Sequence, residues 1–160
     1  MIVIGIDPGI ATIGYGVIHK QGNKQILLAH GAILTPAHTP LSKRLLSIHQ
    51  QLSQLIALHQ PTAMAVEELF FNTNVSTGMI VAQARGVILL TAEQHNIAVT
   101  GYTPQDVKMA VCGYGRADKK QVQDMVKRLL NLETRPKPDD VADAIAIAIC
   151  HCQCARIKSL

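Results

Sequence analysis

The stretch that decides the fold is MIVIGIDPGIATIGYGVI, residues 1–18. Its apolar, β-type run Ile2–Ile6 ends on a carboxylate, Asp7, and Pro8–Gly9 then turn the chain. A second strand-like run, Gly14–His19, follows almost at once. Strands with so few residues between them pair antiparallel. The sequence therefore begins with an antiparallel strand pair whose first member ends on an acid.

Strand and helix patterns alternate through the rest of the chain. A third strand-like run, Gln25–Thr35, follows the polar segment KQGNK, which is a hairpin signal. A helical stripe comes next, at Leu41, Leu45, Ile48, Leu52 and Leu55. Two more strands are predicted at Ala63–Val66 and Ile97–Tyr102, with helices at Val75–Gln94, after Pro104, from about Lys119 to Leu130, and from Asp139. We expect one α/β domain over residues 1–160, with a five-stranded mixed sheet, its first three strands antiparallel, flanked by helices.

Composition narrows the class of protein. With 160 residues, 48% of them hydrophobic, the chain can bury one full core. A net charge of +4 suggests a mildly basic face that tolerates a polyanion. No apolar run approaches the ~18 residues that cross a bilayer, and the N-terminus lacks the cationic start of a signal peptide. We expect a cytoplasmic protein without a membrane partner.

Three of the four cysteines, Cys150, Cys152 and Cys154, crowd one short stretch. This spacing fits neither a disulfide framework nor a familiar zinc knuckle. On a helix Cys150 and Cys154 share a face and Cys152 points away. Reduced, partly buried thiols are favoured over a zinc site, and no role follows from the pattern.

Acids gather where elements begin or end. Asp7 ends the first strand, and Glu67, followed by Glu68, ends the fourth. In the last helix Asp140 and Asp143 stand three apart and share a face, while Asp139 and Asp143, four apart, share one almost as well. Acids at a helix start are ordinarily caps. Asp143 lies further in, beside the apolar run 144–150, where an unpaired charge is costly.

Three or four carboxylates without Cys or His ligands are typical of Mg²⁺ or Mn²⁺ sites, which keep waters for substrate phosphates. Two such ions, ~3.5 to 4 Å apart, would activate a water and stabilise the leaving 3′-oxygen in phosphodiester cleavage. The carboxylates thus predict a hard-cation site.

Basic and aromatic residues follow the acids. Phe70 and Phe71 come directly after the strand-end acids, and an exposed ring there can stack on an unpaired base. The core is an equally good place for Phe71. Four cations, Lys108, Arg116, Lys119 and Lys120, cluster beside a Gly-flanked loop and are candidate phosphate contacts. Arg85 is interpreted either as a dimer contact or as a plain surface residue.

Five blocks of the sequence resemble, in order, the RuvC-type Holliday-junction resolvases of the ribonuclease H superfamily: GIDPGIATIGYGVI, AVEELFF, AQARGVI, QDVKMAVCGYGRADKKQV and DDVADAIAIAICHC. The resemblance implies a ribonuclease H-like fold. The family's catalytic, metal-holding positions fall on Asp7, Glu67, Asp140 and Asp143, which leaves Asp139 as an adjacent cap. Its junction-contacting lysines fall on Lys108 and Lys119, and its base-stacking aromatic falls on Phe70.

The resemblance also implies function. We expect a Mg²⁺-dependent homodimer, with Mn²⁺ able to substitute, that cuts four-way DNA junctions by paired nicks and cooperates with the RuvA and RuvB branch-migration proteins. The alternatives are a ribonuclease H-like enzyme that trims ribosomal RNA precursors, a sugar-kinase or actin-like ATPase, and a junction-binding module without catalysis. The ATPases duplicate this unit, and 160 residues hold one copy. The FF pair and the DDVADA segment favour the resolvase.

Overall fold

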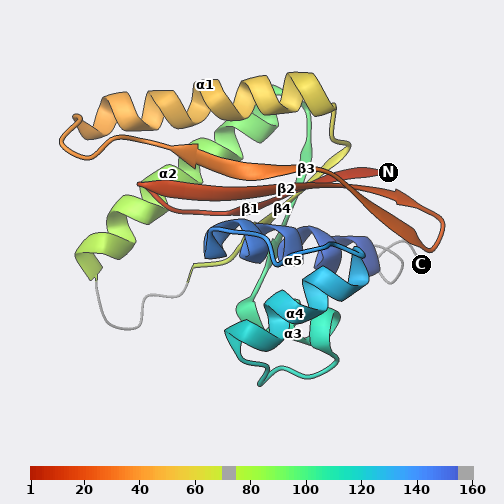
Figure 1. The fold of residues 1–160 in the computed structure, drawn as a ribbon. Helices are drawn as coiled ribbons and strands as arrows, with labels where there is room; N and C mark the ends of the chain where they lie inside the picture. Colours follow the sequence, from red (N-terminus) through yellow and green to blue (C-terminus); the bar gives the residue numbers. More distant parts are fainter. Residues whose placement is uncertain (70–74, 155–160) are drawn as a thin grey trace.

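The computed structural model describes residues 1–69 and 75–154, which form a five-stranded sheet between two layers of helices (Figure 1). The elements are, in chain order, β1 (Ile2–Asp7), β2 (Thr12–Gln21), β3 (Lys24–Leu34), α1 (Leu41–His59), β4 (Ala63–Glu67), α2 (Val75–Gln94), β5 (Ala98–Tyr102), α3 (Pro104–Cys112), α4 (Lys119–Leu129) and α5 (Asp139–Cys154). Helices α1 and α2 cover one face, and α5, with α3 and α4 beyond it, covers the other.

The strands lie in the order β3-β2-β1-β4-β5. Strand β2 pairs antiparallel with both β1 and β3, while β4 is parallel to β1 and β5 is parallel to β4. This confirms the predicted mixed sheet and its three antiparallel strands. Strand β2 runs further than predicted, to Gln21, so the hairpin turn shrinks to Gly22 and Asn23. Gly22 has φ +59°, a conformation that glycine adopts without strain.

Strand alternation decides which side chains face α5. Along a strand, successive side chains point to opposite faces. Ile4 and Ile6 of β1 pack in the core under α1 and α2, whereas Val3 packs in the core under α5. Strand β4 follows the same rule, with Met64 and Val66 on the first face and Ala63 and Ala65 on the second. The last residues of these strands, Asp7 and Glu67, continue the series that faces α5.

Helix α5 lies unusually close to the sheet because glycines replace side chains beneath it. A Cβ on Gly14 would overlap the backbone carbonyl oxygen of Asp140, and one on Gly5 would come within 2.7 Å of the Ala148 nitrogen. A Cβ on Gly16 would lie 2.6 Å from the Ile145 side chain. The helix backbone thus rests directly on β1 and β2, and it brings its acidic N-terminal turn to the ends of these strands.

Helix α2 is the one helix within residues 1–69 and 75–154 that is long and apolar enough, by length and composition, to cross a membrane. The core helix of a folded domain passes the same test, and α2 buries Ala84, Ile88, Thr91 and Ala92. Its other side leaves large apolar residues exposed, namely Val75, Met79, Ile80 and Leu90. The helix therefore has one face in the core and one apolar face in solvent.

Candidate active site

Asp7 and Glu67 lie at the same end of the sheet, on neighbouring strands. Strands β1 and β4 run parallel, and their last paired residues are Ile6 and Val66. The next residue of each strand is an acid, and strand alternation directs both acids to the α5 face. On their outer sides Asp7 pairs with Gly14 and Glu67 with Tyr102. The predicted meeting of these two carboxylates therefore follows from the register of the central strands.

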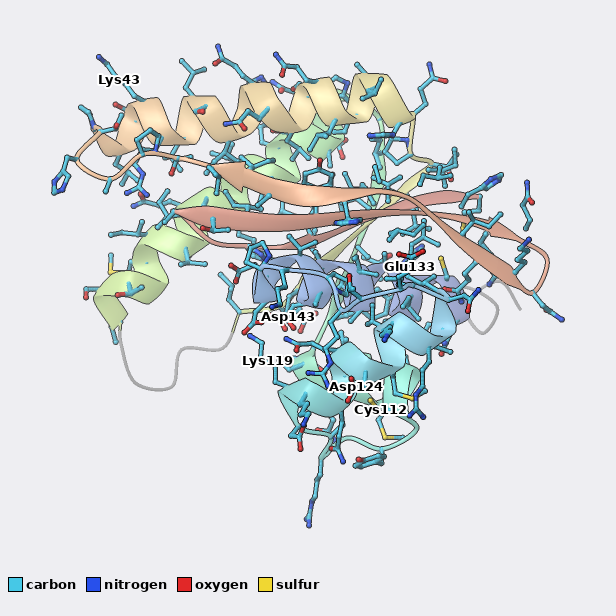
Figure 2. All side chains as sticks on the ribbon, viewed as in Figure 1. Lys43, Cys112, Lys119, Asp124, Glu133 and Asp143 are labelled. Carbon is cyan, nitrogen blue, oxygen red and sulfur yellow. The ribbon has the colours of Figure 1, made fainter. Side chains whose placement is uncertain are left out.

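Helix α5 adds acids to this strand end. Glu67 and Asp143 line one cleft of about 230 Å³ together with Lys108 and Lys119. In Figure 2 Lys119 and Asp143 lie beside each other, where α4 approaches the first turns of α5. The cleft thus joins side chains from β4, α3, α4 and α5 around a group of negative charges.

The pKa of Asp7 is raised from 3.8 to about 8. Burial is the main cause, followed by the nearby charges of Glu67, Asp143 and Asp140, while Lys119 acts in the opposite direction. The side chain of Asp139, in contrast, is 62% exposed and is ion-paired with Lys119. This geometry favours Asp140 over Asp139 as the partner of Asp7, a choice that helix spacing left open.

Glu67 and Asp143 experience the same repulsion between like charges. Burial and the charge of Asp143 raise the pKa of Glu67, and burial likewise raises that of Asp143. Lys119 partly offsets this, with its Nζ 3.2 Å from Asp143 Oδ2 and 3.4 Å from Asp139 Oδ2. These acids in turn raise the pKa of Lys119. Lys119 is the local counter-ion of the acidic group, a role that sequence reasoning did not assign to it.

Helix capping fixes the place of Lys119. The Asp118 side chain accepts a hydrogen bond from the Gln121 backbone, and the Gln121 side chain accepts one from the Asp118 backbone, each at 2.8 Å. This reciprocal capping box starts α4 at Lys119. Asp139 is held nearby, because its Oδ1 accepts a hydrogen bond from Gln123 at 3.0 Å. The N-terminal turns of α4 and α5 are therefore linked to each other beside the cleft.

The donor set suits a hard divalent cation. Asp7, Glu67, Asp140 and Asp143 offer only oxygen ligands, as Mg²⁺ and Mn²⁺ prefer, and their mutual repulsion is what such an ion relieves. Within the described part of the chain, no three Asp, Glu, His or Cys side chains lie close enough together to coordinate one ion. Lys119 is ion-paired with Asp143 at this place.

Of the other predicted site residues, only some line the cleft. Lys108 and Lys119 line the cleft, whereas Arg116 and Lys120 are exposed outside its lining. Phe70 lies outside the described residues, as does Phe71.

Two further features of the site were missed by sequence reasoning. The first is the contact of Arg85 with the strand end, where its Nε donates to the backbone carbonyl of Glu67 at 3.3 Å. The second is the set of glycines under α5, for which alternating glycines in an apolar strand were an available signal of close backbone approach.

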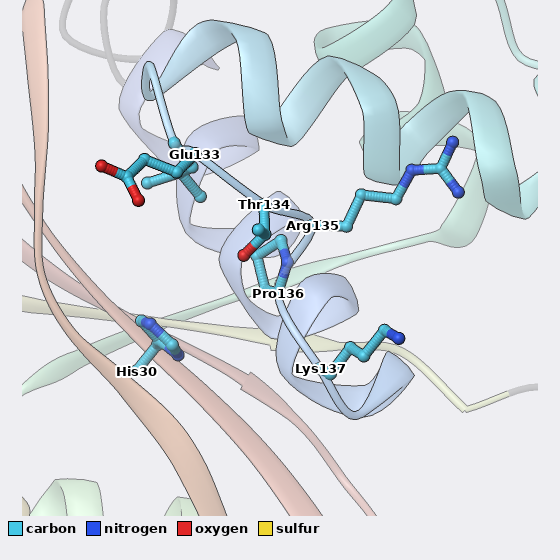
Figure 3. Close-up of a pocket in the computed structure, with 7 residues that line it drawn as sticks. His30, Glu133, Thr134, Arg135, Pro136 and Lys137 are labelled. Carbon is cyan, nitrogen blue, oxygen red and sulfur yellow. The ribbon is translucent and has the colours of Figure 1, made fainter.

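A wider hollow of about 740 Å³ lies elsewhere, between β3 and the segment that precedes α5 (Figure 3). His30, Glu133, Arg135 and Lys137 are among its lining residues, and Arg135 is ion-paired with Asp124. Only one of the lining residues is a carboxylate. Its donors do not suit a multi-carboxylate metal site, so the smaller cleft is the candidate active site.

Comparison with known proteins yields close relatives. The sequence profile of the family described as "Crossover junction endodeoxyribonuclease RuvC" matches residues 3–151. A protein of that name from Heliobacterium modesticaldum is 58% identical over 150 residues, which cover 94% of this chain and 93% of the relative. The solved Thermus thermophilus RuvC structure superposes with a TM-score of 0.92, at 37% identity, over 99% of this chain and 97% of that chain. A second structure, T. thermophilus RuvC in complex with Holliday junction substrate, superposes with a TM-score of 0.90 at 35% identity, over 98% and 96% of the two chains. These matches confirm the expected ribonuclease H-like fold.

Proposed function

Because this chain belongs to the RuvC family of crossover junction endodeoxyribonucleases, we propose that it resolves Holliday junctions by a metal-dependent pair of symmetric nicks. The substrate follows from the relative solved in complex with a Holliday junction. One observation carries the chemistry: Asp7 and Glu67 end neighbouring parallel strands and face the acids of α5. Such a group of buried oxygens serves phosphodiester hydrolysis through divalent cations.

Asp7, Glu67, Asp140 and Asp143 would hold Mg²⁺, or Mn²⁺ in its place, with two ions in each site. The cations supply activation of a water and neutralisation of charge on the leaving oxygen. In the hydrolysis the water oxygen bonds to phosphorus and the bond from phosphorus to the 3′-oxygen breaks. The 3′-oxygen takes a proton, which leaves 3′-hydroxyl and 5′-phosphate ends.

The chain's own cations position the DNA. Lys108 and Lys119 line the cleft, where their charges attract the phosphates that flank the cut. Lys119, which is ion-paired with Asp143, would be free to bind a phosphate if Asp143 held a cation instead. Arg116 and Lys120 extend this positive surface along the exposed α3–α4 connection. We assign base stacking to Phe70, by its position in the family motif.

We further propose a homodimer, because the two cuts lie on symmetric strands and α2 exposes an apolar face. Within the family's pathway of recombination and DNA repair, RuvA and RuvB are the expected partners. The expected location is the cytoplasm, where bacterial chromosomal DNA lies.

Cleavage of a synthetic four-way junction, with both product ends mapped, tests the proposal. We expect Mg²⁺-dependent nicks at symmetric positions, products that a ligase seals, and little cutting of the matched linear duplex. Failure to nick the junction at any Mg²⁺ or Mn²⁺ concentration would contradict the assignment. A preference for structured RNA over the junction would instead identify an RNA-processing nuclease.

A further inference from the structure

Arg85 connects α2 to the strand that carries Glu67. Its Nε donates a hydrogen bond to the backbone carbonyl oxygen of Glu67 at 3.3 Å. The pairing of β4 with β1 ends one residue earlier, at Val66. On the opposite side, β4 continues its contact with β5, because the Glu68 backbone donates to the Tyr102 carbonyl at 2.8 Å. Arg85 therefore binds the strand end where the β1 ladder has already stopped.

The surroundings of Arg85 hold it toward this strand end. Its neighbour Ala84 and, one turn on, Ile88 are fully buried against the sheet, so this part of α2 is anchored in the core. Arg85 is half-buried, and it lines a hollow of about 330 Å³ with Ala82, Glu68 and Leu69. The arginine thus crosses the gap between the helix and the end of β4.

We propose that Arg85 is a positioning residue, which fixes the backbone of Glu67 so that its carboxylate stays directed at the cation site. This inference rests on the proposed function. Two acids on adjacent strand ends repel each other. The backbone of Glu67 is easily displaced by this repulsion, because it is no longer paired with β1. A hydrogen bond from a charged donor to the Glu67 carbonyl resists the displacement without adding a ligand to the cation.

The position of Arg85 also connects the site to the rest of α2. The first half of this helix exposes Met79 and Ile80, the face assigned above to the second subunit. Arg85 follows on the same helix and reaches the catalytic strand. If a dimer buried the exposed face of α2, Arg85 would transmit the restraint on the helix to the Glu67 backbone.

The test compares Arg85→Met and Arg85→Lys with a matched control, Arg44→Met. Arg44 is also half-buried, and it also bonds a residue just beyond a strand end, donating to Thr35 Oγ1 at 2.8 Å and to the Thr35 carbonyl at 3.4 Å. Mn²⁺ binding to the DNA-free protein is measured by electron paramagnetic resonance, and kcat and KM are measured on the four-way junction. Thermal unfolding and light scattering check folding and subunit number.

Arg85→Met is expected to weaken Mn²⁺ binding and to lower kcat, each by about 10-fold, with junction affinity within about two-fold of the parent protein. Arg85→Lys should recover part of both, because a lysine also donates but lacks the fixed guanidinium geometry. Arg44→Met should affect only the unfolding temperature.

Unchanged Mn²⁺ binding and kcat in a folded Arg85→Met protein would overturn the proposal. So would a weakened junction affinity with an unchanged kcat, because that result places Arg85 on the DNA. If Arg85→Met does not fold, the same two outcomes are read from Arg85→Lys. Should the parent protein cut no junction at all, the proposed function fails, while Mn²⁺ binding still decides the role of Arg85.

Discussion

Gly14 lies directly beneath Asp140, so that any side chain on Gly14 would overlap the Asp140 carbonyl oxygen. The contact positions the start of α5 over the end of β1. Gly14→Ala must push this helix turn away from Asp7, and we expect it to cost about 1–3 kcal/mol of stability and to weaken metal binding. Chemical denaturation and Mn²⁺ titration measure the two effects. Gly86→Ala is the control, because a methyl group there meets nothing within 4 Å; equal losses in both variants would contradict the explanation.

Asp7→Asn is expected to keep junction binding and to reduce cleavage by roughly 1,000-fold or more, about 4 kcal/mol of transition-state stabilisation. The amide preserves the shape of the side chain but loses the charge that holds the cation. A junction gel shift and a single-turnover cleavage assay separate binding from chemistry. Undiminished cutting by Asp7→Asn would show that Asp7 is not a required metal ligand.

The same variant is expected to stabilise the metal-free fold in alkaline solution. The folded-state pKa of Asp7, about 8, lies above the ordinary value of 3.8, so the folded chain binds this proton more tightly than the unfolded chain. The stability that this group contributes is fully present below pH 3.8 and is lost as the pH rises through 8. With EDTA present, Asp7→Asn should exceed the parent protein by about 2–4 kcal/mol at pH 8 and match it near pH 4. Lower stability of Asp7→Asn at pH 8 would show that the ionised carboxylate makes favourable contacts.

Metal affinity should depend on pH for the same reason. Below pH 8 a cation that binds through Asp7 must displace its proton. The Mn²⁺ concentration at half-saturation should therefore rise by about 10-fold for each pH unit between 7.5 and 6. Titrations at several pH values measure this slope, which should be shallower for Asp7→Asn. A flat profile for the parent protein would mean that Asp7 carries no proton there.

Lys119 and its neighbour Lys120 are expected to differ in one measurable respect. Each contributes a positive charge, so replacing either with Met should reduce the slope of log affinity against log salt by ~0.9 for each phosphate that the side chain neutralises. Only Lys119 counters the acids of the cleft, and its removal should move half-maximal metal binding to higher pH. Identical pH profiles for the two variants would contradict the counter-ion role.

The exposed face of α2 should govern subunit association. Met79 is 58% exposed, and a glutamate there places a charge in the proposed subunit contact. Met79→Glu is expected to shift the protein to monomer and to replace paired nicks by slow single ones. Leu58→Glu on α1, where the parent side chain is 73% exposed, is the control and should stay dimeric. Light scattering measures the subunit number of both variants. A Met79→Glu protein that remains dimeric would show that the subunit contact lies elsewhere.

Much of the fold follows from local sequence pattern. Continuous apolar runs predict the strands β1 and β4, which are buried on both faces. The face on which Asp7 and Glu67 emerge follows only from the packing of alternate residues against α5. Strands β2 and β3 extend further into their hairpin than predicted, β2 to Gln21 and β3 from Lys24. The residues there are polar and show no strand pattern, which the end of a hairpin tolerates.

The site was predictable only in part. Spacing along α5 left two pairs of acids open, Asp140 with Asp143 and, almost as well placed, Asp139 with Asp143. The contact of α5 with Gly14 and the charge of Asp140 on Asp7 favour Asp140, and both depend on tertiary structure. The roles of Lys119 and Arg85 likewise depend on contacts between elements distant in sequence. No local sequence pattern encodes such contacts. The family resemblance indicated which residues belong to the site but not how their side chains are arranged.

The seating of α5 on the glycines of β1 and β2 also has a consequence for biosynthesis. Asp7 leaves the ribosome more than 130 residues before Asp140, and the two acids meet only when α5 docks on a finished sheet. A nascent or prematurely terminated chain that lacks α5 therefore lacks two of the four acids of the proposed site.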